Sequence, residues 1–172
     1  MSFLGKIAKT FDSINNFIGT VFGTIIVALV ILTVMEVILR KFLNSPTIWS
    51  FEVLKQLFAV YFMITAGYGL LKGAHVSVDI FTQMMSEKGK AILSIVSYLI
   101  FFFPFCCIGA WYGYQYAATS WRMSEHSWST FAPPLYPIKA VICITFALLI
   151  MQGIAEVIKE IFKMKGLSYD GS

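Results

Sequence analysis

The sequence predicts an all-α integral membrane protein with four transmembrane helices, short interfacial amphipathic helices and both termini in the cytoplasm. Its 172 residues are 58% hydrophobic and only 13% charged, and their mean hydropathy is +0.78. Four long windows carry no formal charge. So apolar a composition excludes a soluble enzyme domain and a disordered chain. We expect one membrane domain over residues 1–172, with spans at about 14–39, 48–72, 90–121 and 135–158.

The first two spans follow from charge-free windows. Residues 13–35 form a window of 23 residues, which as a helix rising about 1.5 Å per residue crosses a hydrocarbon core of about 30 Å. This run is longer than the apolar part of a signal peptide, so it is expected to stay as an anchor. The second window, residues 56–71, holds 16 residues and is long enough only if the helix extends back to Phe51. That extension places Glu52 and Lys55 near the membrane surface.

The third and fourth spans differ in length. Residues 91–121 form a window of 31 residues, equivalent to about 46 Å of straight helix. A helix of this length must tilt, protrude or bend, and Pro104 marks the place for a bend. The fourth window, residues 140–155, is completed by residues 135–139 ahead of it. Pro137 suits the first turn of that helix.

The basic residues indicate the orientation, because four spans place both termini on one side of the membrane. Eight basic residues lie on the side of the termini: Lys6, Lys9, Lys72, Lys88, Lys90, Lys159, Lys163 and Lys165. Five lie on the other side: Arg40, Lys41, Lys55, Arg122 and Lys139. Cytoplasmic loops carry the excess of Lys and Arg, so both termini are expected in the cytoplasm. No basic stripe of the kind that binds nucleic acid is present, and no nucleic-acid partner is expected.

Two segments outside the four windows have amphipathic patterns. Near the N-terminus the apolar residues of one helical face are Phe3, Ile7, Phe11 and Ile14. This pattern fits a helix lying in the headgroup region, or an extension of the first span. After the second span another interfacial helix is expected on Val78, Phe81, Met84 and Met85. Ser86 is expected to cap the third span.

The ionisable residues give no support for catalysis. A catalytic site in a bilayer needs such groups gathered at one depth, whereas here they are scattered over both faces. The predicted topology puts the two histidines, His75 and His126, on opposite sides, which argues against their ligating one haem iron. Cys106, Cys107 and Cys143 lie in apolar spans without C-x-x-C spacing. We expect no enzyme activity, metal site or cofactor in this chain.

The charges at the outer ends of the spans have spacings that favour local pairing. Glu36 and Arg40 are four residues apart, and Glu52 and Lys55 are three residues apart, so each helix can neutralise its own carboxylate. A proton or ion relay would instead need acidic residues distributed through the membrane depth. The windows of the second and third spans contain none. This argues against a transport pathway through this chain alone.

Glycine spacing gives a clearer signal for helix packing. Three pairs have the G-x-x-x-G spacing that lets another helix approach closely: Gly19 and Gly23, Gly69 and Gly73, and Gly109 and Gly113. Some of these faces are expected to pack within the chain. Four helices so rich in large apolar residues exceed what a small bundle can bury, so lipid or a larger partner is expected to cover the rest.

Segments at the predicted corners of the bundle resemble a known family. Glu-Val-Ile-Leu-Arg at 36–40 leads to Asn-Ser-Pro at 44–46, followed by Trp49 and Glu52. After the second span, Lys-Gly-Ala-His-Val-Ser-Val-Asp at 72–79 is a basic, glycine-containing turn followed by a His-hydrophobic-x-Val-Asp element. These segments resemble the small, DctQ-like membrane subunit of tripartite ATP-independent periplasmic (TRAP) transporters.

The later part of the chain resembles the same family. Ser124 and Glu125, followed by Pro-Leu-Tyr-Pro-Ile-Lys at 134–139, are similar to its second periplasmic corner. Gln152 lies where a polar residue is common late in the last span of that family. The resemblance covers about residues 15–160 with the same order of four spans.

The resemblance implies a secondary transporter built from three proteins in the cytoplasmic membrane and periplasm of a bacterium or archaeon. A large membrane subunit carries the substrate and sodium sites and works as an elevator. The small subunit holds the static part of the large one and helps to dock a periplasmic substrate-binding protein for uptake of an organic acid. The expected partners are those two proteins and membrane lipids, and the large subunit is expected to be a separate chain. Sodium ions are expected in the large subunit and not in this chain.

The resemblance also suggests roles for individual residues. Those expected to face the binding protein or the large subunit are Arg40, Glu52, Lys55, Glu125 and Lys139. His75 and Asp79 are expected to shape the cytoplasmic turn. Two alternatives stay open at this point. One is a small electron-transfer or quinone-linked anchor subunit, and the other is a packing or lipid-binding protein without a stoichiometric partner.

Overall fold

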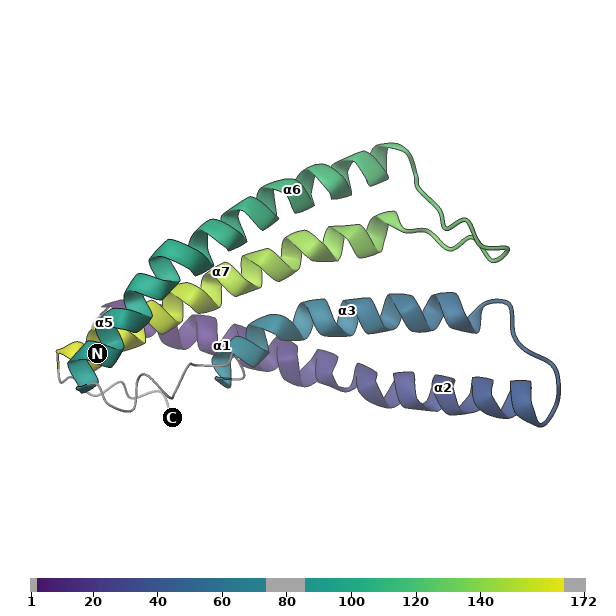
Figure 1. Cartoon of the computed structure of the whole chain (residues 1–172), viewed down its shortest axis with the longest axis horizontal. Coiled ribbons are helices and arrows are strands. Elements are labelled where there is room, and N and C mark those ends of the chain that lie inside the picture. Colours follow the sequence, from purple (N-terminus) through teal and green to yellow (C-terminus); the bar gives the residue numbers. More distant parts are fainter. Residues whose placement is uncertain (1–2, 74–85, 166–172) are drawn as a thin grey trace.

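The computed structural model describes residues 3–73 and 86–165, and nearly all of them are helical (Figure 1). The elements are α1 (Phe3–Gly23), α2 (Ile25–Lys41), α3 (Ser50–Leu71), α5 (Glu87–Ser97), a π-helical turn η1 (Tyr98–Phe102), α6 (Phe103–Arg122) and α7 (Tyr136–Met164). No strand forms among these residues. Four helical segments are long and apolar enough to cross a membrane: Leu4–Lys41, Ser50–Leu71, Lys88–Arg122 and Tyr136–Met164. The predicted all-α, four-span fold class is confirmed, while the cytoplasmic placement of the termini stays a prediction.

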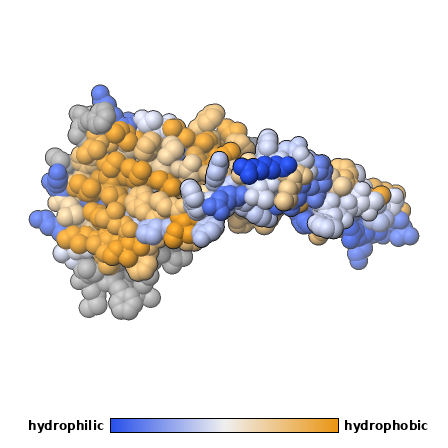
Figure 2. All heavy atoms as spheres, turned by 90° about the horizontal axis from the view of Figure 1, so that it is seen from above, coloured by the Kyte–Doolittle hydropathy of each residue, from blue (hydrophilic) through white to orange (hydrophobic). Residues whose placement is uncertain are grey.

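The spans form two hairpins that diverge from a common end. Figure 1 shows α2 beside α3 and α6 beside α7, with the start of α1 and the end of α7 at one end of the molecule and the loops after α2 and α6 at the other. We call these the terminal end and the loop end. Helix α7 lies in the middle of the bundle, where it packs against α1, α3, α5 and α6. Helix α2 packs mainly against α3. The face seen in Figure 2 is apolar toward the terminal end and more polar toward the loop end.

The N-terminal amphipathic segment extends the first span. Helix α1 begins at Phe3 and continues to Gly23, and only Thr24 separates it from α2. Its buried Ala8 packs with Ala155 and Ile158 of α7. Ile7 and Phe11 lie against that cluster, so much of the apolar face predicted for the headgroup region is covered by α7. Of the two possibilities that the pattern allowed, the structure therefore favours the extension.

The second predicted interfacial helix, on Val78, Phe81, Met84 and Met85, lies outside the described residues. The predicted cap beyond it is confirmed. The Ser86 hydroxyl accepts a hydrogen bond from the Gly89 amide at 3.3 Å, at the start of α5.

The long third span changes its helical winding next to its proline. Pro104 lies in the first turn of α6, and the turn before it, Tyr98–Phe102, is π-helical. There the amide of Phe103 donates to the carbonyl of Tyr98, five residues earlier. A proline lacks an amide proton and crowds the carbonyl four residues before it, and a wider turn relieves that conflict. The irregularity therefore lies one turn ahead of the residue that the sequence marked.

Three of the glycines singled out by spacing lie at close helix crossings. A Cβ atom added at Gly19 of α1 would overlap the ring of Tyr68 on α3. A Cβ at Gly109 of α6 would overlap the ring of Phe146 on α7. One at Gly113 would lie 2.8 Å from a methyl carbon of Ile142, also on α7. Small residues at these positions let the helix backbones approach one another.

The other predicted glycines behave differently. Gly69 lies within α3, and Gly73 follows that helix with a φ of +68°, where glycine is favoured because it has no side chain to clash. A Cβ added at Gly23 would meet nothing within 4 Å. Two glycines that the spacing did not mark, Gly67 and Gly153, also lie at tight contacts, with Asn15 and Phe102 respectively. Gly23 is thus a notch that the described chain leaves unfilled.

Candidate functional site

Glu36 fixes the first loop at the loop end of the molecule. Its buried carboxylate accepts a hydrogen bond from the Arg40 guanidinium at 3.0 Å and from the Thr47 hydroxyl at 2.7 Å. The first contact is the i,i+4 pair that the spacing predicted, and it leaves much of the Arg40 side chain exposed. The second ties the loop between α2 and α3 back onto α2. Thr47 was not predicted, since no periodicity links it to Glu36.

Glu52 joins the two hairpins. Its buried carboxylate accepts from Lys55 at 3.3 Å, the predicted i,i+3 pair, and from the hydroxyl of Ser127 at 3.2 Å. Ser127 belongs to the loop between α6 and α7, 75 residues further along the chain. A carboxylate in the first turn of a helix is also favoured by the helix dipole. Lys55 stays largely exposed, with its ammonium 5.1 Å from the centroid of the Phe51 ring.

Glu125 and Lys139 form the base of the second loop. Their side chains make an ion pair, and the Lys139 ammonium lies 3.9 Å from the centroid of the Tyr116 ring. Backbone bonds from Leu135 to Glu125 and from Ser127 to Pro133, both 2.9 Å, hold the loop together. Lys139 is largely buried, and its contacts support the loop. The hydrogen bond from Lys139 lowers the pKa of the Glu125 carboxyl below its ordinary value of 4.5.

Acid is therefore expected to loosen the 123–135 loop. A carboxyl whose pKa is lower in the folded state contributes stability that is fully present above its ordinary value and is lost as pH falls through the lowered one. We expect hydrogen exchange at the Ser127 and Leu135 amides, corrected for its intrinsic pH dependence, to be constant near neutrality and to rise below about pH 4. In Glu125→Gln the exchange should be faster at neutral pH and lack this rise. An identical acid profile in that variant would contradict the assignment.

The loop end also exposes apolar side chains beside these charges. Trp128 is fully exposed at the second loop, and Phe42, Leu43 and Ile48 are largely exposed in the first. Exposed apolar groups gathered with charged ones are typical of a surface that meets another protein or the membrane interface. Of the residues predicted for such contact, Arg40 and Lys55 are largely exposed, Glu125 is partly exposed, and Glu52 and Lys139 are largely buried.

A second polar cluster lies toward the terminal end, between α1 and α7. The side chain of Gln152 is fully buried, and its amide donates to Asp12 at 2.9 Å and to Glu156 at 3.0 Å. The Lys159 ammonium lies 2.8 Å from a carboxylate oxygen of each acid. The buried Asn15, three residues after Asp12 on α1, lies against Gly67 of α3. The sequence marked Gln152, but nothing in it paired that residue with Asp12.

Two of the predicted site residues have no described position. His75 and Asp79 lie outside the described residues. Within residues 3–73 and 86–165 there is no group of three or more His, Cys, Asp or Glu side chains placed to hold a metal ion.

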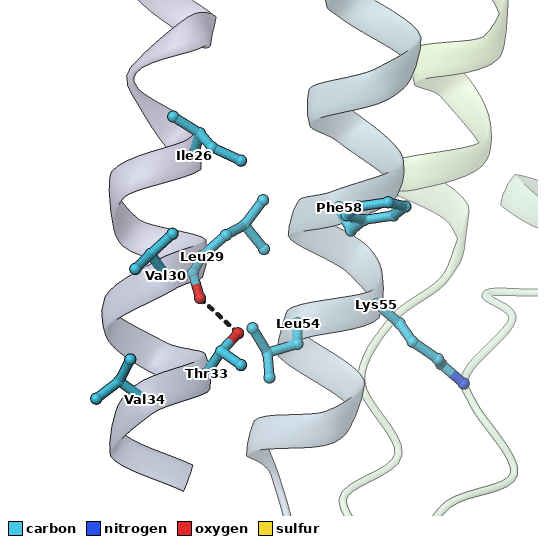
Figure 3. Close-up of a pocket in the computed structure, with 8 residues that line it drawn as sticks. All are labelled: Ile26, Leu29, Val30, Thr33, Val34, Leu54, Lys55 and Phe58. Carbon is cyan, nitrogen blue, oxygen red and sulfur yellow. Dashed lines mark hydrogen bonds between the residues drawn. The ribbon is translucent and has the colours of Figure 1, made fainter. Parts of the chain in front are cut away.

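An apolar groove runs along α2 on the side that faces α3. It measures about 470 Å³ and lies between α2 and α3, and the residues labelled in Figure 3 line it. Its one hydroxyl, that of Thr33, donates to the carbonyl of Leu29 at 2.7 Å. Lys55 stands at one side of the groove (Figure 3). Apart from Thr33 and Lys55, the residues that line the groove are apolar.

Comparison with known proteins agrees with this architecture. A family model described as "Tripartite ATP-independent periplasmic transporters, DctQ component" matches residues 29–163. The sialic acid TRAP transporter permease protein SiaT of Haemophilus influenzae (strain 86-028NP) is 28% identical over 94 residues, which are 55% of this chain and 15% of SiaT. The chain therefore matches only a small part of that relative, and no solved structure matches it. Because the family model covers well over half of the sequence, the chain belongs to the DctQ family, the small component of TRAP transporters.

Proposed function

We propose that this chain is the small membrane subunit of a sodium-driven TRAP transporter. In this role it scaffolds a large elevator subunit and helps to dock a periplasmic substrate-binding protein during uptake of an organic acid. The loops then face the periplasm, and both termini lie on the cytoplasmic side of the inner membrane. The observation that carries the proposal is membership of the DctQ family in a four-span chain.

The distribution of charge supports a scaffold rather than a conduit. In the described helices the formal charges lie near the two ends, and the middle of each span has none. A proton or ion relay needs ionisable groups at intermediate depths. The substrate and sodium sites are therefore assigned to the large subunit.

The loop end supports the docking role. Its loops are held by three carboxylates. That of Glu36 accepts from Thr47 of the first loop, that of Glu52 accepts from Ser127 of the second loop, and that of Glu125 pairs with Lys139 at the base of the second loop. A surface whose loops are fixed before binding loses less conformational entropy when a partner arrives. Arg40, Lys55 and Trp128 are the exposed groups that such a surface offers.

The docking role is tested by uptake in vesicles that contain this chain, its large subunit and the binding protein. Arg40→Ala removes an exposed charge, and Glu52→Ala releases the second loop. Each is expected to reduce uptake about tenfold, equivalent to about 1.4 kcal/mol, without a similar loss of this chain from the membrane. Lys163→Ala at the terminal end breaks an exposed ion pair and serves as the matched control. Full uptake with Arg40 and Glu52 both replaced would exclude the docking role.

The scaffold role is tested by affinity purification of the tagged chain from its native membranes in mild detergent. A large polytopic protein in stoichiometric amount is the expected result. Recovery of the chain alone from several mild detergents would contradict the proposal.

A further inference from the structure

Helix α2 has few neighbours in the described part of the chain. It packs mainly against α3, and one row of its residues faces outward at steps of three or four. The row begins at Gly23, at the end of α1, and continues with Val27, Val30, Val34 and Ile38, which are 58%, 55%, 52% and 46% exposed. We call these five residues the α2 stripe.

The α2 stripe forms a ridge between two grooves. The groove of about 470 Å³ in Figure 3 lies toward α3 and is lined by Val30 and Val34. A second groove, of about 440 Å³, is lined by the same two valines together with Ile38. Helices pack by placing a ridge of one into the groove of the other. The surface of α2 therefore has the relief that a neighbouring helix requires.

The composition of α2 argues against lipid as its main neighbour. Trp and Tyr are enriched where spans cross the headgroup level. Residues 24–41 contain no aromatic residue, whereas α6 exposes Trp111, Tyr112, Tyr114 and Tyr116. Apart from Gly23, the stripe is instead made of valine and isoleucine, whose branched side chains have little rotamer freedom to lose on packing.

Gly23, the first residue of the stripe, gives a second sign that another helix packs here. Gly19, Gly109 and Gly113 are each covered by a side chain of another helix, but nothing in the described chain lies within 4 Å of a Cβ added at Gly23. In membranes a small residue lets a second helix come close. In SiaT the matching region is only 15% of the protein, so there a similar region belongs to a much longer chain.

We propose that the α2 stripe is the surface on which a transmembrane helix of the large subunit packs, with Gly23 at the point of closest approach. This inference rests on the proposed function, because it assumes that a large subunit is present. It locates the contact on α2 and leaves the outer face of α6 to lipid.

Site-specific photocrosslinking in cells that make both subunits tests the location. A photoreactive residue at Val30 or Val34 is expected to crosslink to the large subunit at least five times more than one at Phe101 or Ile108, which are exposed on the η1 and α6 side. Stronger crosslinks from Phe101 or Ile108 would overturn the inference. So would crosslinks from α2 to lipid alone, or to a second copy of this chain.

Gly23→Leu separates failure of this inference from failure of the proposed function. The variant is expected to retain normal amounts of folded chain but to recover at least five times less large subunit on affinity purification. If the unsubstituted chain recovers no large subunit, the proposed function itself fails. If the unsubstituted chain recovers the large subunit, and Gly23→Leu and Val30→Trp recover equal amounts of it, the transporter role stands and the α2 contact is wrong.

Discussion

Lys159→Met is expected to leave little folded, monodisperse protein. The Lys159 ammonium is the cation in a cluster with two carboxylates, those of Asp12 and Glu156, each 2.8 Å away. The Lys159 side chain is only 15% exposed. Its loss leaves two like charges close together, with the amide of Gln152 donating to both. Removing one partner of a buried ion pair costs about 3–5 kcal/mol, a large share of the stability of a typical domain.

The loss is measured by size-exclusion chromatography in mild detergent and by the midpoint of thermal unfolding. Lys163→Met is the matched control, since Lys163 lies one turn further along α7 and pairs in the same i,i+3 register with Glu160. Its side chain is 65% exposed, and exposed pairs of this kind contribute only about 0–1 kcal/mol. Equal thermal midpoints for the two variants would contradict a structural role for the cluster.

A second substitution distinguishes charge imbalance from lost packing. Adding Asp12→Asn to Lys159→Met removes one of the two carboxylates, so only that of Glu156 remains in the cluster. Leaving a buried charge uncompensated is costly, and one such charge costs less than two. The double variant is therefore expected to unfold at a higher temperature than Lys159→Met alone. A further decrease would mean that Asp12 stabilises the bundle in another way.

The parts of the fold set by local chemistry could be predicted from the sequence. Charge-free windows identified four spans, since a bilayer tolerates few uncompensated charges. The pairs of Glu36 with Arg40 and of Glu52 with Lys55 form as their spacing indicated, because residues three or four apart face each other on a helix. The cap at Ser86 is likewise a local event.

Contacts between distant segments could not be predicted in this way. No period relates Ser127 to Glu52, or Asp12 to Gln152, which are 75 and 140 residues apart. These bonds depend on how the hairpins pack. The N-terminal helix presents the same limit, since an amphipathic pattern shows that a face is apolar and not whether lipid or α7 covers it.

Glycine spacing has the same limitation, and the pair Gly19 and Gly23 shows it on one helix. The G-x-x-x-G pattern treats the two positions alike. In the structure Gly19 lies against the Tyr68 ring of α3, while nothing lies within 4 Å of a Cβ at Gly23. A sequence pattern indicates that a helix can be approached closely, but the fold decides which glycine is already occupied.

Gly19→Leu is expected to destabilise the chain even when it is purified without any partner. The new side chain would occupy the space of the Tyr68 ring, so α1 and α3 must separate or Tyr68 must leave its place. Overpacking of this kind typically costs about 1–3 kcal/mol, which exceeds the gain of about 1 kcal/mol from replacing glycine within a helix. A lower midpoint of thermal unfolding in detergent, with more aggregate, is the measured result.

Gly23→Leu makes the same chemical change four residues away, where the described chain leaves open space. The added Cβ meets no atom of the described chain within 4 Å, so the midpoint of the isolated chain should stay unchanged or rise slightly. If both substitutions lowered the midpoint equally, the loss would come from the helix itself and not from its neighbours. A selective loss at Gly19, together with a loss of large-subunit recovery at Gly23, would instead divide the first span into a part that holds this bundle together and a part that binds the next protein.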